Sequence, residues 1–111
     1  MQLQVIIEDR ARSVTVPEYV ANEGEEFFAK MDADMDGGWQ MSRTWVEKPN
    51  QVQRCQIAAD RLVAALEVGD EPMKMLMAGY IVSRLPGVTA VRVDNEGDMM
   101  GTEFVGAQSV Q

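Results

Sequence analysis

Three aspartates at alternate positions are the residues of this chain whose type and spacing most clearly predict chemistry. They are Asp32, Asp34 and Asp36, and a glycine pair at 37–38 and then Gln40 follow them. Calcium takes six to eight oxygen ligands, and a loop supplies them from alternate positions around a glycine that permits a sharp turn. The pattern therefore predicts a divalent-cation site whose ligands come from Asp32, Asp34, Asp36, Gly38 and Gln40.

Residues 27–43 resemble the EF-hand family in this stretch and in no other part of the chain. The aspartates match positions 1, 3 and 5 of that family's calcium loop, and Gly37 matches position 6. Arg43 stands at position 12, where the family has a bidentate glutamate. The resemblance implies calcium binding that is weak, because a cation replaces two ligand oxygens.

A solvated acidic turn is the other interpretation of the same residues. Aspartate side chains accept hydrogen bonds from their own backbone in turns, and Gly37 and Gly38 tolerate positive φ. Since the ligand at position 12 is missing, the turn is the favoured prediction. The calcium site remains the alternative.

The composition argues against most catalytic machinery. The chain of 111 residues has no histidine, and its single Cys55 can form neither an intramolecular disulfide nor a thiolate metal site. Several polar residues could serve a reaction, but no spacing sets any two of them in a defined relation: Asp60, Arg61, Tyr80 and Arg84. We therefore predict a protein that is not an enzyme and that has no cofactor.

The formal net charge of −8 bears on partners. Nucleic-acid binding needs clustered Lys and Arg, which this chain lacks, whereas a basic protein surface is a possible partner. No apolar stretch approaches the ~20 residues of a membrane span, and the first residues carry no signal-peptide pattern. We expect a soluble, cytoplasmic protein that binds neither nucleic acid nor membrane.

The elements that must position these residues begin with strands. Residues 2–8 alternate apolar and polar side chains, and residues 13–17 repeat the alternation, which predicts a hairpin. The spacing of Asn22 and Glu25 is that of a capping box and predicts a helix over 23–31. Residues 39–46 alternate again and predict one strand with both tryptophans on its core-facing side.

A helical hairpin is predicted in the middle of the chain. Asn50 and Gln53 form a capping box ahead of an apolar stripe, Gly69 ends the first helix, and Pro72 opens a second helix over 72–84. The predicted stripe is Val52, Cys55, Ala59, Leu62, Val63 and Leu66. A strand over 88–93, a turn over 94–98, a return strand over 99–105 and a frayed end over 106–111 complete the prediction.

The second predicted helix is apolar on nearly every side. Such a helix needs cover on all sides, and we expect one sheet and one helix to be too little cover in so small a domain. A second copy of the chain is the simplest cover, and methionine suits contacts that must repack. The sequence therefore predicts a homodimer whose interface is Met73, Met77, Tyr80 and Ile81.

These elements predict a single α+β domain over residues 1–111. Its antiparallel sheet has four to five strands, and the helical hairpin packs on one face of that sheet. The predicted function is that of a small non-catalytic protein-interaction or accessory module, homodimeric through the Met-rich helix. A weak calcium-binding protein that uses loop 32–40 is the alternative.

Overall fold

A computed structural model describes residues 1–106, apart from the side chain of Ala21, so most of the predicted frayed end lies outside the described residues. Four strands form the main sheet in the order β2-β1-β5-β6. They are β1 (Gln2–Ile7), β2 (Arg10–Thr15), β5 (Ala90–Arg92) and β6 (Glu103–Val105). The predicted α+β class and the four-stranded sheet are confirmed.

The prediction that the sheet is antiparallel throughout is wrong for one pair of strands, which is parallel. β1 pairs with β2 in antiparallel register, and β5 pairs with β6 in the same way. β1 and β5 run parallel, because the α-helices that the structure describes lie between β2 and β5 in sequence and return the chain to the edge where β1 begins. The carboxyl ends of β1 and β5 therefore lie side by side.

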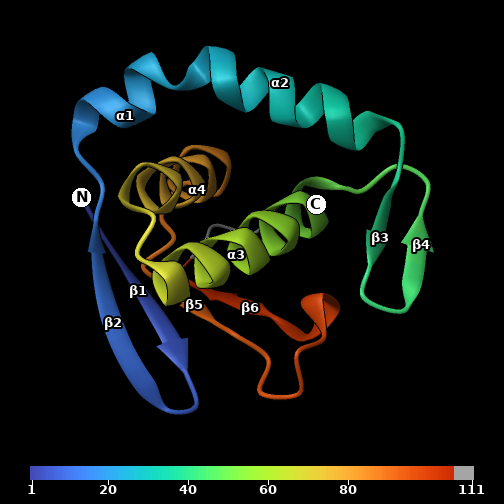
Figure 1. Cartoon of the computed structure of the whole chain (residues 1–111). Coiled ribbons are helices and arrows are strands. Elements are labelled where there is room, and N and C mark those ends of the chain that lie inside the picture. Colours follow the sequence, from blue (N-terminus) through green and yellow to red (C-terminus); the bar gives the residue numbers. More distant parts are fainter. Residues whose placement is uncertain (107–111) are drawn as a thin grey trace.

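The predicted helical hairpin is confirmed. It consists of α3 (Gln51–Val68) and α4 (Glu71–Arg84), packed against the sheet (Figure 1). Asn50 and Gln53 form the predicted capping box, and Gly69 adopts the left-handed conformation at φ 74°. Asp70 then caps α4, so a two-residue connection turns the chain.

Two further helices form a layer over α4, with bounds that differ from the prediction. α1 (Glu18–Glu23) contains Asn22, and α2 (Glu25–Asp36) begins after Gly24. The helix predicted over 23–31 is therefore wrong in its bounds. The loop predicted over 32–40 is also wrong at its start, because α2 continues through all three aspartates.

The strand predicted over 39–46 is a separate hairpin of β3 (Trp39–Met41) and β4 (Thr44–Val46). The chain reverses at Ser42, whose φ is 57°. Trp45 is 56% exposed, so the prediction that both tryptophans face the core is wrong for this one. Further on, a short 3-10 helix, η1 (Met99–Gly101), replaces the first half of the predicted return strand.

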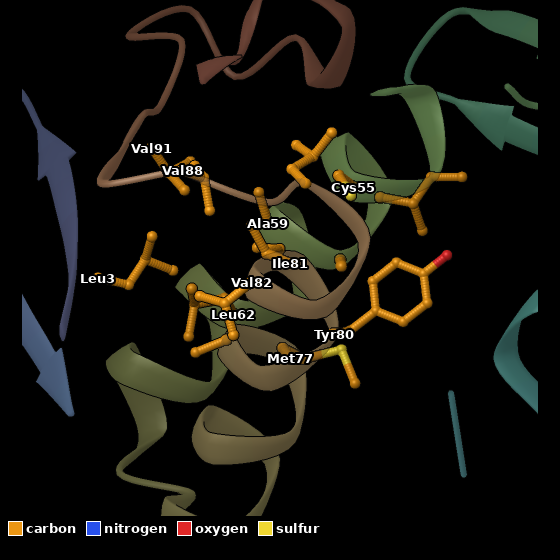
Figure 2. Packing of buried hydrophobic residues seen from close by; sticks show 14 of the residues in the cluster. Leu3, Cys55, Ala59, Leu62, Met77, Tyr80, Ile81, Val82, Val88 and Val91 are labelled. Atoms are coloured by element: carbon orange, nitrogen blue, oxygen red, sulfur yellow. The ribbon is translucent and has the colours of Figure 1, made fainter. Parts of the chain in front are cut away.

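α4 is enclosed by elements of its own chain. Met77, Tyr80 and Ile81 are fully buried, with α1 and α2 on one side and α3 and the sheet on the others (Figure 1). Figure 2 shows Met77 and Tyr80 on one side of α4 and Leu3, from the sheet, on the other. The prediction that a second copy must cover these residues is therefore wrong, and an interface through them has no exposed surface.

The close packing of α1 and α2 on α4 depends on Gly79. A Cβ atom at Gly79 would lie 2.8 Å from Cγ1 of Val20 and 3.1 Å from Cζ of Phe28. The missing side chain therefore lets the outer helices supply the cover that the sequence assigned to a partner. None of the helices that the structure describes is long and apolar enough to cross a membrane.

Candidate functional site

The predicted cation ligands are spread around α2 and beyond it. Residues two apart on a helix point about 200° from each other, so Asp34 faces solvent while Asp32 and Asp36 share the side toward α3 and α4. Gln40 lies on β3, where its side-chain amide donates to the backbone oxygen of Ser42 at 2.9 Å. Among residues 1–106, no group of three or more His, Cys, Asp or Glu side chains is placed to hold a metal ion.

Asp32 is the centre of an ion and hydrogen-bond network. Its Oδ1 accepts from the Tyr80 hydroxyl at 2.5 Å, and its Oδ2 accepts from Nη2 of Arg84 at 2.9 Å. Arg54 donates to the backbone oxygen of Asp32 at 3.0 Å and to Oδ1 of Asp36 at 2.6 Å. The network therefore ties α2 to both helices of the hairpin.

The charges in this network favour each other. Burial acts to raise the pKa of Asp32, but the hydrogen bonds from Tyr80 and Arg84 outweigh it, and the pKa lies below its usual value. Arg84 also pairs with Glu25 at 2.8 Å and lies over the Tyr80 ring at 5.1 Å. Since every partner is satisfied, we interpret the network as the means by which α2 is held in place.

A different region forms a hollow, which the sequence did not predict. It has a volume of about 220 Å³ and lies at the carboxyl ends of β1 and β5, beside α3. Ile7 and Val93 follow from the two parallel strands, Val63 comes from α3 and Met99 from η1. In sheets with parallel strands, ligands commonly bind in the crevice outside the carboxyl ends of those strands.

The rim of this hollow is acidic. Of the described residues that line it, four are carboxylates and none is Lys or Arg: Glu8, Asp60, Asp94 and Asp98. Asp94 accepts the Asp98 N–H at 2.9 Å, and Asp98 accepts the Met100 N–H of η1 at 3.0 Å. Within residues 1–106, the side chains of Glu8 and Asp60 accept no hydrogen bond and form no ion pair.

The 94–98 turn that forms one wall is fixed by local and long-range contacts. Asp94 accepts the N–H groups of Glu96 and Asp98, which is the usual behaviour of an aspartate that opens a turn. The Asn95 side chain accepts the Glu8 N–H at 3.3 Å and thereby joins this turn to the end of β1. These contacts hold the 94–98 turn, and with it one wall of the hollow, against the end of β1.

η1 is held from two sides. The Gln56 side chain of α3 donates to the backbone oxygens of Met100 and Thr102, at 3.2 and 3.0 Å. The Ser42 hydroxyl accepts the Met99 N–H at 3.0 Å, which also anchors the β3–β4 hairpin. These bonds hold the backbone of η1, from which Met99 lines the hollow.

Asp60 is an exposed residue of the rim whose negative charge is disfavoured by its surroundings. Burial raises the pKa of its carboxyl group, and the negative charge of Glu67 on the same helix raises it further. The side chain belongs to α3, and its spacing in the sequence sets it in no defined relation to any other polar residue. A cation placed in the hollow would compensate this cost.

Comparison of the chain with protein-family models, with curated proteins and with solved structures finds no match. The function is therefore inferred from the residues of this chain alone.

Proposed function

We propose that this protein is a small non-catalytic interaction module that binds a basic segment of another protein. The observation that carries the proposal is the hollow at the ends of β1 and β5, which combines apolar walls with an acidic rim. Interfaces gain affinity from an apolar anchor in a pocket and gain orientation from complementary charge around it.

Charge supports a basic partner over other kinds. The chain carries a formal net charge of −8, so its field attracts cationic surfaces from a distance and repels nucleic acid. Two acidic turns meet beside the hollow, since Glu8 and Asp9 connect β1 to β2 and residues 94–98 connect β5 to η1. We also propose the cytoplasm as the compartment, because the single Cys55 is free and buried.

The size of the hollow supports a protein segment over a free metabolite. Its volume of about 220 Å³ is below the ~300–1,000 Å³ typical of small-molecule sites. A space of this size accommodates one side chain, while the charged turns around it contact neighbouring residues of the partner.

A titration with defined peptides tests the proposal. The probe is a twelve-residue Gly/Ser peptide with four arginines, and the control is the same peptide with four glutamates. We expect backbone amide signals of residues 7–9, 60–63 and 93–99 to shift with the arginine peptide only, and to shift less at higher salt. Shifts confined to α2, or no binding at millimolar peptide, would refute the proposal.

A matched pair of variants separates this face from general attraction to a negative protein. Glu96→Gln removes a charge from the 94–98 turn, and Asp34→Asn removes the same charge from the exposed side of α2. We expect weaker binding for the first variant and unchanged binding for the second. Equal effects would mean that only the net charge matters.

A further inference from the structure

The hollow has walls and a rim that suit one kind of side chain. Its inner surface is apolar, from Ile7, Val63, Val93 and Met99, and its carboxylates stand at the opening. Long cationic side chains bury an aliphatic stem along apolar surface while their charged ends stay near water. The order of apolar wall and acidic rim matches the order of stem and head in such a side chain.

We propose that the hollow receives a single arginine side chain of the partner segment, with the Asp60 carboxylate as the main acceptor for its guanidinium group. This inference rests on the proposed function and specifies which residue of a basic segment enters the hollow. The stem lies on Val63 and Met99, and the head lies between α3 and the acidic turns.

Arginine fits this rim better than lysine does. A guanidinium group is planar, has five N–H donors and donates to more than one carboxylate at once, whereas an ammonium group acts as a point charge. Asp60 on α3 and Glu8 at the end of β1 approach the opening from different elements. Neither accepts another hydrogen bond within residues 1–106, so both are available to a guanidinium group.

Hydrogen bonds within the chain limit which carboxylates contact the guanidinium group. Asp94 and Asp98 each use a carboxylate oxygen to accept a backbone N–H group. They therefore contribute negative potential more than direct contacts with the guanidinium group. Two basic side chains line neighbouring hollows beside the acidic turns: Arg43 beside residues 96–98, and Arg92, which pairs with Glu103 at 3.3 Å. Within the described residues, no cation of the chain itself lines the hollow.

The experiment uses side-chain probes in place of a peptide. N-acetyl-arginine methylamide is titrated into the full-length protein, and the methyl signals of Val63, Val93 and Met99 are followed by NMR. The matching lysine and citrulline compounds are the comparisons, since citrulline keeps the shape of arginine and lacks its charge. We expect methyl shifts that are largest for arginine, smaller for lysine and absent for citrulline.

Two variants assign the acceptor. Asp60→Asn keeps the size and helix propensity of the residue, and we expect it to weaken arginine binding about tenfold, which is about 1.4 kcal/mol. Asp34→Asn is the matched control and should have no effect. Equal effects of the two variants, or equal binding of the lysine and arginine compounds, would overturn the assignment.

The outcome also separates this inference from the proposed function. If the four-arginine peptide binds at the acidic turns while the arginine compound leaves the three methyl signals unmoved, the acidic face is a docking surface but the hollow does not take arginine. If neither probe binds, both proposals fail. A small polyamine that moves the same methyl signals as strongly as the arginine compound would replace the protein segment as the occupant.

Discussion

Replacing Asp32 by alanine should destabilise the protein far more than replacing its neighbour Asp34. Asp32 accepts hydrogen bonds from Tyr80, Arg84 and Arg54, so one substitution removes the acceptor that three groups share. Asp34 lies on the same helix but faces solvent. The comparison therefore isolates the network from helix propensity and from net charge.

The expected loss can be worked out contact by contact. The Tyr80 hydroxyl is left without its acceptor, which costs about 1–3 kcal/mol for a buried donor. Arg84 keeps Glu25 and Arg54 keeps Asp36, so each loses only a partly exposed ion pair, worth below about 1 kcal/mol. We expect Asp32→Ala to lower the free energy of unfolding by about 2–3 kcal/mol at pH 7.

Urea unfolding followed by tryptophan fluorescence measures this change. Asp34→Ala should fall within about 0.5 kcal/mol of the unsubstituted protein, because exposed helix positions tolerate alanine well. A double-mutant cycle with Tyr80→Phe should give a coupling energy of at least about 0.5 kcal/mol. If Asp32→Ala is as mild as Asp34→Ala, the network does not hold α2 and the interpretation is wrong.

Four further predictions use other parts of the molecule. The pKa of Asp32 in the folded protein lies below its value in the unfolded chain. The carboxylate therefore contributes its full stabilisation above the unfolded pKa and loses it as the pH falls through the folded pKa. In urea titrations at several pH values, Asp32→Asn should reduce this loss of stability in acid. Glu8 and Asp9 have φ of 50° and 67° in a two-residue turn, a geometry that favours the sequence Asn-Gly. The double substitution Glu8→Asn with Asp9→Gly should therefore stabilise the fold by about 1 kcal/mol and weaken peptide binding. An unchanged free energy of unfolding would contradict this. Met77→Glu should unfold the chain, as read by circular dichroism, rather than dissociate an oligomer in sedimentation, and a folded monomer would count against it. Millimolar calcium should leave the thermal midpoint and Trp39 emission unchanged, because guanidinium groups already engage Asp32 and Asp36; a raised midpoint would restore the calcium alternative.

Local signals in the sequence predicted the central hairpin well. The capping box at Asn50 and Gln53, the left-handed Gly69 and the cap and proline that open α4 each act within one turn of the helix, so their effect is visible without tertiary contacts. The alternation in β1 likewise predicted that Leu3 and Val5 are buried.

The prediction of a loop at the aspartates of α2 failed for the opposite reason. Three aspartates followed by two glycines favour a turn locally, because aspartate is a weak helix former. What makes them helical is long-range: Arg54 and Arg84 reach Asp32 and Asp36 from two other helices. A sequence pattern contains no information about which distant cation meets which carboxylate, so the pattern looked like a loop for a metal.

The enclosure of α4 was missed because the outer layer was underestimated. The sequence predicted a short helix before residue 32, whereas α1 and α2 together cover α4 from residue 18 to residue 36. Phe28, Met31 and Met35 supply the buried side chains of that cover. Because α1 and α2 cover α4 within one chain, no exposed surface of α4 requires a second copy. The homodimer and the contact through Met73 therefore stay predictions.

The sequence did not predict the hollow, because its residues come from three distant segments, around positions 7–8, 60–63 and 93–102. Two of its local features are nevertheless unfavourable for the isolated fold. Glu8 and Asp9 occupy left-handed positions, and the pKa of Asp60 is raised by burial and then by Glu67. A bound guanidinium group leaves the backbone cost unchanged but opposes the electrostatic one, because it favours the ionised form of the Asp60 carboxyl group. Ligands that bind only the folded state also stabilise it, so a guanidinium group bound at Asp60 would offset the cost that burial and Glu67 impose on its charge.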